Sequence, residues 1–194
     1  MSSYTRIQLE QWLKKIDVIA DRVLDVGGAQ NPVSFRVNRW EVRQYEIFDL
    51  PEPHMTHEAV NKNIPLIMGN IEHGFDPSLE GKYDIVFCLE VMEYILNPTA
   101  VVENLKRLLK PGGILYISFP FIYPHHSPFN KDYLRYTRWG AERLLLDAGF
   151  FIEVKPRKAM AGGLENFYSE EGMRRSKEFT DHDDVGYMVK AVKA

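Results

Sequence analysis

The chain has a single cysteine and no long apolar run, and both absences narrow the classes of protein to which it can belong. One cysteine, Cys88, cannot form an intramolecular disulfide, which removes a common mark of secreted proteins. No apolar stretch approaches the roughly 18 residues that a membrane-spanning helix needs, and the first residues do not form an apolar signal region. We therefore expect a cytoplasmic protein that does not associate with membranes.

An excess of charge of either sign is also missing. The net charge of -3 gives no strong attraction to nucleic acid or to acidic membranes, and no basic stripe alternates with aromatic residues. The histidines show neither HExxH nor the cysteine-rich spacing that binds zinc. We therefore expect neither a nucleic-acid partner nor a metal site.

The composition is that of an ordinary globular protein. Apolar residues make up 45% of the chain and charged residues 26%, so there is enough apolar material for a packed core. A length of 194 residues suits one α/β domain. We expect a single domain over residues 1–194.

Hydrophobic periodicity and turn signals predict strands that alternate with helices. Apolar residues at three- and four-residue steps predict a first helix over 9–20. Asn97 is expected to cap a second helix, and Thr137 a third that runs to Ala148. The other predicted elements are a weak helix at 162–177 and strands at 22–26, 42–48, 64–68, 83–89, 114–119, 150–154 and 187–192.

This alternation implies βαβ units and a parallel sheet that helices cover on both faces. The strands 150–154 and 187–192 break the rhythm and are expected to pair antiparallel at one edge. The predicted fold is therefore α/β, a Rossmann-like doubly wound sheet of about seven strands, mainly parallel with an antiparallel C-terminal edge strand.

The loop over residues 25–32 follows the first predicted strand, where doubly wound sheets bind their ligands. Gly27 and Gly28 allow backbone amides to approach a ligand, and Asp25 can accept a hydrogen bond from an ammonium group or a loop amide. The spacing fits neither the dinucleotide pattern GxGxxG nor the phosphate-loop pattern GxxxxGK[ST], which disfavours a nicotinamide-dependent oxidoreductase. On its own, the loop also fits a tight turn that binds nothing.

Several motifs in order along the chain are more specific than the loop alone. They are the segments 23–32 (VLDVGGAQNP), 69–72 (GNIE), 83–94 (YDIVFCLEVMEY) and 108–115 (LLKPGGIL), with Asp49 placed 22 residues after Gly27. This set resembles class I S-adenosylmethionine-dependent methyltransferases. The resemblance implies S-adenosylmethionine as the cofactor and the following binding residues: Asp25, Gly27, Gly28, Ala29, Asp49, Asn70, Ile71 and Leu89.

The resemblance also implies roles within that set. Asp49 corresponds to the acidic residue that accepts from the two ribose hydroxyls. Asn70 stands where aspartate is more frequent, and its amide oxygen can accept from the adenine amino group, while Ile71 offers its backbone amide to the ring. Ala29 and Asn31 replace usual glycines of the loop.

Methyl transfer requires an attacking atom aligned with the methyl group, and a general base only for some acceptors. The segment 119–137 is rich in aromatic residues that can wall an acceptor pocket. The candidate proton acceptors are His126, His125 and Glu90, although a loop hydrogen bond or an exposed helical turn explains these residues as well. The candidate acceptor-binding residues are Tyr94, Tyr123, Tyr133 and Arg135, and Arg135 is expected to pair with Asp132.

The sequence thus predicts transfer of a methyl group to a small molecule, such as a sugar, nucleotide or secondary metabolite, by direct in-line displacement. A non-catalytic module or regulatory partner with the same fold stays open as an alternative. The protein is expected to be a monomer or a homodimer.

Overall fold

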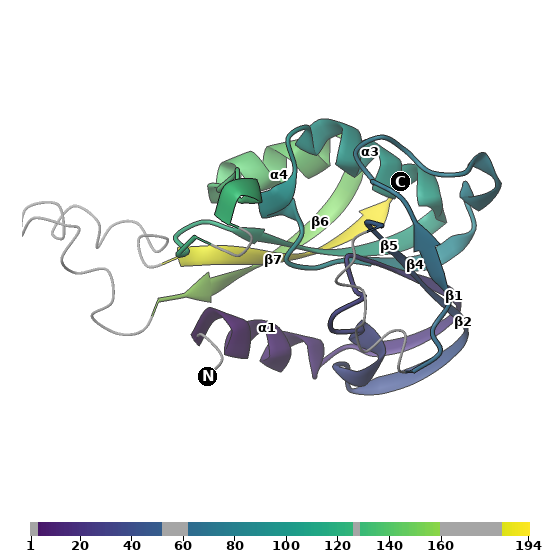
Figure 1. The fold of residues 1–194 in the computed structure, drawn as a ribbon. Helices are drawn as coiled ribbons and strands as arrows, with labels where there is room; N and C mark the ends of the chain where they lie inside the picture. Colours follow the sequence, from purple (N-terminus) through teal and green to yellow (C-terminus); the bar gives the residue numbers. More distant parts are fainter. Residues whose placement is uncertain (1–3, 52–61, 126–128, 160–183) are drawn as a thin grey trace, which may run out of the picture.

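One sheet organises the protein, and a computed structural model describes it over residues 4–51, 62–125, 129–159 and 184–194. Seven strands lie in the order β3-β2-β1-β4-β5-β7-β6 (Figure 1). The strands are β1 (Asp17–Val26), β2 (Arg39–Asp49), β3 (Leu66–Met68), β4 (Tyr83–Cys88), β5 (Leu109–Pro120), β6 (Phe150–Lys158) and β7 (Asp184–Lys193). The helices are α1 (Tyr4–Leu13), α3 (Pro98–Leu108) and α4 (Arg138–Asp147), with 3-10 turns η1 (Val33–Phe35), η2 (Pro77–Leu79), η3 (Met92–Tyr94) and η4 (Phe129–Lys131). The predicted fold class is confirmed.

The order of the strands reverses between β1 and β4. β1 pairs in parallel with β2 on one side and with β4 on the other. The chain therefore builds outward from β1 to β3, returns to β4, and builds outward again in the opposite direction. The loops that follow β1 and β4 meet at this switch point, where sheets of this kind bind ligands.

The last two strands form the expected antiparallel pair, and β7 lies inside the sheet. β7 runs antiparallel to both β5 and β6, so β6 takes the edge position. The burial of β7 and β6 agrees with their positions inside the sheet and at its edge. β7 is apolar and buried over most of its length, whereas β6 exposes Glu153 and Lys155 and contains Pro156, residues that suit a sheet edge.

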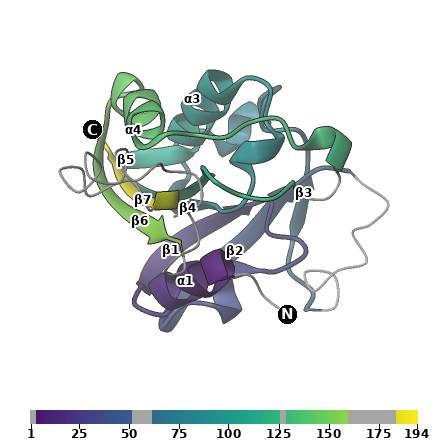
Figure 2. The same cartoon turned by 90° about the vertical axis from the view of Figure 1, so that its left-hand side faces the viewer.

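Helices cover both faces of the sheet, α3 and α4 on one face and α1 on the other (Figures 1 and 2). Both predicted caps are confirmed. The Oδ1 atom of Asn97 accepts from the amide of Ala100 at 3.1 Å, and the Oγ1 atom of Thr137 accepts from the amide of Gly140 at 3.1 Å. Each bond satisfies an amide that the first turn of a helix leaves without a partner.

The first predicted helix is placed wrongly. The helix α1 ends at Leu13, and β1 begins at Asp17, so the second half of the predicted helix 9–20 is strand. Val18 pairs with Trp40 of β2, and Ala20 pairs with Val42. The apolar residues of this stretch imitate a helical period, but the branched side chains of Val18 and Ile19 suit a strand, and pairing with β2 decides the outcome.

The predicted helix at 162–177 lies outside the described residues. Within the described part of the chain, no helix is long and apolar enough to cross a membrane.

We predict that α1 contributes to stability through its buried face. Leu9 is fully buried in the core between α1 and the sheet, whereas Ile7 on the same helix is 42% exposed. Leu9→Ala is expected to lower the free energy of unfolding by about 2–5 kcal/mol, and the control Ile7→Ala by less than about 1 kcal/mol. Urea unfolding measures both. Equal losses would show that α1 does not pack as described.

Candidate functional site

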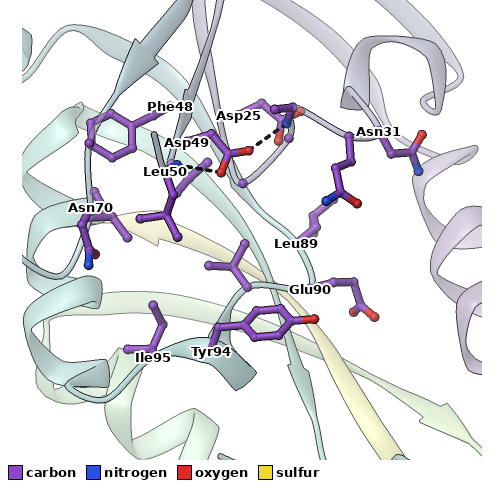
Figure 3. A pocket seen from close by; sticks show the side chains of 18 of the residues that line it. Asp25, Asn31, Phe48, Asp49, Leu50, Asn70, Leu89, Glu90, Tyr94 and Ile95 are labelled. Carbon is purple, nitrogen blue, oxygen red and sulfur yellow. Dashed lines mark hydrogen bonds between the residues drawn. The ribbon is translucent and has the colours of Figure 1, made fainter. Parts of the chain in front are cut away.

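A cavity of about 830 Å³ opens at the carboxyl edge of the sheet, at the switch point between β1 and β4. The loops after β1, β2, β3 and β4 supply most of its lining, and Arg6 of α1 and Lys131 of η4 complete it. Figure 3 shows Asp49 between Asn31 on one side and Asn70 on the other, with Tyr94 across the cavity. All of the residues that the sequence assigns to the cofactor line this cavity.

The turn after β1 is too tight for side chains at two positions. Gly27 has a φ angle of +77°, and a Cβ atom there would lie 2.4 Å from Cγ2 of Val91. At Gly28, a Cβ atom would lie 2.2 Å from Oδ2 of Asp25. Both distances are well inside van der Waals contact, so only glycine permits this turn. The backbone of the loop can therefore approach a ligand closely.

Asp25 holds the loop from the protein side. Its carboxyl group is almost fully buried, and Oδ2 accepts from the amide of Val33 and from the hydroxyl of Tyr45, both at 2.8 Å. The sequence allows Asp25 to accept from an ammonium group or from a loop amide, and the structure shows the loop amide of Val33. Burial raises the pKa of Asp25 to about 6, although the hydrogen bonds from Val33 and Tyr45 oppose the rise.

Asp49 ends β2 and connects two loops. Its Oδ2 atom accepts from the amide of Ala29 at 3.0 Å, and its Oδ1 atom from the amide of Leu50 at 2.8 Å (Figure 3). Each carboxylate oxygen can accept a further hydrogen bond. The carboxylate is therefore fixed in orientation while it faces the cavity, which suits a pair of vicinal hydroxyls.

The loop after β3 closes one end of the cavity. The amide of Gly69 donates to the carbonyl of Asp49 at 2.9 Å, and the Oδ1 atom of Asn70 accepts from the amide of Glu72 at 2.9 Å. The carbonyl of Ile71 accepts from the side chain of Asn104 on α3 at 2.8 Å. This turn thus uses the Asn70 oxygen internally, so the amide NH₂ group and a second lone pair are what Asn70 can offer a ligand.

Glu90 follows β4, next to the buried Leu89, in a left-handed conformation with a φ angle of +57°. Its amide donates to Oγ of Ser118 at 2.8 Å, and that hydroxyl donates to Oε1 of Glu90 at 2.8 Å. The buried guanidinium of Arg157 lies 3.0 Å from the same oxygen. Glu90 is therefore a positioned, ion-paired carboxylate at the cavity wall and not part of an exposed helical turn. Ser118 and Arg157 could not be predicted as partners of Glu90, because both are distant from it in the chain.

Tyr94 lines the cavity below Asp49 (Figure 3), and residues 133–136 bond to η3, the turn that carries Tyr94. The amides of Tyr133 and Leu134 donate to the carbonyl of Glu93 at 2.7 and 3.1 Å. The hydroxyl of Tyr136 donates to the carbonyl of Met92 at 3.0 Å. Burial, with the nearby carboxylate of Glu93, raises the pKa of Tyr94 above its usual range, so its hydroxyl is a neutral donor near pH 7.

The remaining candidate residues in the described part of the chain lie outside the cavity lining. Arg135 forms the expected pair with Asp132, with Nη2 2.6 Å from Oδ2, and also donates to the carbonyls of Leu134 and Tyr123, so it braces this segment. His125 is largely exposed and lies 3.6 Å from Asp132. Arg135, His125, Tyr123 and the half-exposed Tyr133 do not line the cavity. His126 lies outside the described residues.

Two arginines of the cavity lining were missed from the sequence. Arg6 of α1 and Arg36, which follows η1, both pair with Glu10, at 3.0 and 2.8 Å. The spacing of four residues between Arg6 and Glu10 suits a helical ion pair, but the predicted helix began only at residue 9 and so did not include Arg6. Nothing in the sequence placed this pair beside the loop after β1.

A family model described as a methyltransferase domain matches residues 3–174. The chain belongs to this methyltransferase family. Its sheet and its ordered motifs are those of the class I enzymes that use S-adenosylmethionine, so the expected family and cofactor are confirmed.

The curated relatives match part of the chain. The probable biofilm formation methyltransferase WspC of Pseudomonas putida is 39% identical over 89 residues, which cover 43% of this chain and 20% of the relative. The ubiquinone biosynthesis O-methyltransferase of Xanthomonas oryzae is 27% identical over 128 residues, which cover 58% of this chain and 48% of the relative. The chain thus spans less than half the length of these relatives.

Solved structures share the fold. A Haloferax volcanii methyltransferase in complex with the Trm112 methyltransferase activator aligns with a TM-score of 0.65 and 16% identity, over 97% of this chain and 88% of that one. The Haemonchus contortus phosphoethanolamine N-methyltransferase 2, in complex with S-adenosylmethionine, aligns with a TM-score of 0.60 and 16% identity. The alignment covers 97% of this chain and 51% of that one. At these identities the likeness establishes the fold alone.

We predict that Asp25→Asn flattens the dependence of stability on pH between about pH 4 and 6. Asp25 titrates near 6 when folded and near 3.9 in an unfolded chain. The folded state therefore binds more protons in this window, and its stability falls as the pH rises, by about 3 kcal/mol across the window. Asparagine keeps an acceptor oxygen for Val33 and Tyr45 but does not titrate.

Urea unfolding at pH 4 and pH 7 measures this effect for both proteins. The control Asp147→Asn removes an exposed carboxylate of α4 and should retain the slope of the unaltered protein. Parallel pH profiles for the Asp25 variant and the unaltered protein would contradict the assigned titration.

Proposed function

We propose that the chain transfers a methyl group from S-adenosylmethionine to a small-molecule acceptor by direct in-line displacement. One observation carries this proposal: a single cavity brings the glycine turn, Asp49 and Asn70 together with Glu90 and Tyr94. Its volume of about 830 Å³ lies toward the upper end of the range for ligand pockets, about 300–1,000 Å³. The cavity thus has room for a cofactor and for part of an acceptor.

The residues of the cavity fit the cofactor. Gly27 and Gly28 line the cavity without side chains, because a Cβ atom at either position would collide with Val91 or Asp25. A ligand in the cavity therefore meets the backbone of the loop directly. Asp49 would accept from the ribose hydroxyls, and Asn70 and Ile71 would flank the adenine. When bound, S-adenosylmethionine supplies an electrophilic methyl group on sulfur. Leu89 and the apolar part of the wall would keep water from that group.

Glu90 is the residue of the described chain best placed to take a proton from an acceptor. Ser118 and Arg157 both hold its Oε1 atom, which fixes the carboxylate in one orientation at the cavity wall. A hydroxyl or ammonium acceptor would need such a base, whereas a carboxylate or thiolate acceptor would not. Tyr94 would contact the acceptor from the opposite side. His125 does not line the cavity, and His126, outside the described residues, stays a sequence-based candidate.

Two features support a small acceptor. Tyr94 of η3 and Lys131 of η4 are the residues of those two turns that line the cavity, and the net charge of -3 does not attract nucleic acid. One relative is named as a ubiquinone biosynthesis O-methyltransferase, a name that favours a small acceptor.

We predict that Asp49→Asn weakens S-adenosylmethionine binding about tenfold or more. The change removes the charge that a vicinal diol prefers, and a hydrogen bond to a charged group contributes about 1.5–3 kcal/mol. Isothermal titration calorimetry on the full chain measures the affinity, and thermal unfolding checks that the variant folds. The control Asp147→Asn should bind normally. Unchanged affinity in a folded Asp49 variant would remove Asp49 from the site.

We also predict that the chain forms S-adenosylhomocysteine when it is given S-adenosylmethionine and pools of sugars, nucleotides or phenolic metabolites. Product formation above the acceptor-free rate identifies the active pool. With that acceptor, Glu90→Gln should lower kcat by about 100-fold or more, while the affinity for S-adenosylmethionine stays the same. Tight cofactor binding without product in any pool would favour the non-catalytic alternative.

A further inference from the structure

A second cavity, of about 290 Å³, lies on the face of the sheet against which α1 packs. Its walls come from α1, the turn after α1 and the strands β1, β5, β6 and β7, and it shares no lining residue with the cavity at the carboxyl edge. Figures 1 and 2 show α1 along this face of the sheet. The volume is close to the lower limit of about 300 Å³ for ligand pockets, so this cavity suits a small ligand.

Tyr116 of β5 brings a buried hydroxyl group to this cavity. The residue is 6% exposed, and its ring stacks on Phe87 and meets the ring of Trp12, with centroids 5.0 and 5.6 Å apart. Among the described residues, the hydroxyl has no hydrogen-bond partner, although buried tyrosine hydroxyls usually have one. Burial, with the carboxylate of Glu153, raises the pKa of Tyr116, so its hydroxyl is a neutral donor near pH 7.

Lys190 of β7 brings an ammonium group to the same cavity. It lies directly opposite Tyr116 of β5 and directly opposite Glu153 of β6, so the three side chains share one face of the sheet. Lys190 is partly buried, and within the described ranges its ammonium forms neither an ion pair nor a hydrogen bond. Two neighbouring donors, one neutral and one charged, are therefore available to a ligand with acceptor oxygens.

The charges around these two donors favour an anion. Lys155 lies two residues after Glu153 on the same face of β6, and Lys15 belongs to the turn after α1. Asp17, the second carboxylate of the lining, accepts from the side chain of Asn38 at 2.7 Å. The three lysines thus exceed the two carboxylates by one positive charge.

We propose that this second cavity binds a small phosphate ester. Lys190 and Tyr116 would donate to the phosphate oxygens, and the ring of Trp12 would flank the organic group. Lysine binds phosphate as a point charge, whereas the planar fork of arginine suits carboxylates, and no arginine of the described residues lines this cavity. The site requires no methyl donor, so the inference goes beyond the proposed function and does not depend on it.

The wall that carries Trp12 is held in place before any ligand binds. Leu13, next to Trp12, is fully buried. The amide of Lys15 donates to the carbonyl of Trp12 at 3.0 Å, and the amide of Ile16 donates to the carbonyl of Leu13 at 2.9 Å. These bonds close the turn between α1 and β1, so binding needs little ordering of this wall.

Two substitutions separate ligand binding from folding. Tyr116→Phe keeps the ring contacts with Trp12 and Phe87 and removes only the hydroxyl, so the midpoint of urea unfolding should not fall. Lys190→Gln removes the charge of a partly exposed side chain, and Lys190→Arg restores it. Lys14→Gln is the control, because Lys14 is exposed next to Lys15 and does not line the cavity.

The experiment titrates the full chain with phenyl phosphate and with inorganic phosphate by isothermal titration calorimetry. Phenyl phosphate is expected to bind at one site, and inorganic phosphate about fivefold or more weakly, because it lacks a ring to contact Trp12. Lys190→Gln and Tyr116→Phe should each weaken phenyl phosphate about fivefold or more, while Lys190→Arg stays within about threefold and Lys14→Gln changes nothing. Saturating S-adenosylmethionine should leave the affinity for phenyl phosphate unchanged.

Four results would overturn the inference: no binding of phenyl phosphate, equal affinity for inorganic phosphate, full affinity in both Lys190→Gln and Tyr116→Phe, or displacement of phenyl phosphate by S-adenosylmethionine. The last result would place the phosphate in the cavity at the carboxyl edge. A lower midpoint of urea unfolding for Tyr116→Phe would show that the hydroxyl is bonded within the protein and would remove it from the site. Failure of the unaltered chain to bind S-adenosylmethionine would overturn the proposed function alone.

Discussion

The close approach of the backbone at Gly27 and Gly28 to its neighbours determines how the whole carboxyl edge of the sheet is built. A side chain at Gly27 would collide with Val91 of the loop after β4, and one at Gly28 with the carboxyl group of Asp25. The same turn is held by Asp25 from within and by Asp49 from the next strand. Burial of a carboxylate that titrates near pH 6 is the cost of this arrangement, and the hydrogen bonds from Val33 and Tyr45 offset it in part.

The cavity forms at the switch point of the sheet, where the constrained loop after β1 meets the loops of neighbouring strands. Because β1 lies between β2 and β4, the loops after all three strands meet at one edge, and hydrogen bonds from Gly27 to Phe48 and from Gly69 to Asp49 connect them in sequence. Long-range pairs complete the walls: Arg157 of the edge strand reaches Glu90, and α1 supplies Arg6. The chemistry of the cavity thus depends on residues from nearly the whole length of the described chain.

Sequence reasoning predicts the parts of this structure that are encoded locally. The caps at Asn97 and Thr137, the glycine turn, Asp49 at the end of β2 and the fold class all follow from short patterns, and the structure agrees. The boundary between α1 and β1 does not follow, because Ile16, Ile19 and Ala20 fit a helical period and only pairing with β2 selects the strand. The partners of Glu90 and the arginines around Glu10 could not be predicted either, since each contact joins distant segments and depends on the packing of complete elements.

A crystal structure of the full chain with S-adenosylhomocysteine tests the central claim, that this cavity holds the cofactor in one orientation, most directly. We predict the adenine beside Asn70 and Ile71, the ribose hydroxyls on Asp49, and the sulfur facing Glu90 and Tyr94. Density for the ligand elsewhere, or in the reverse orientation with the adenine beside Asn31, would contradict it.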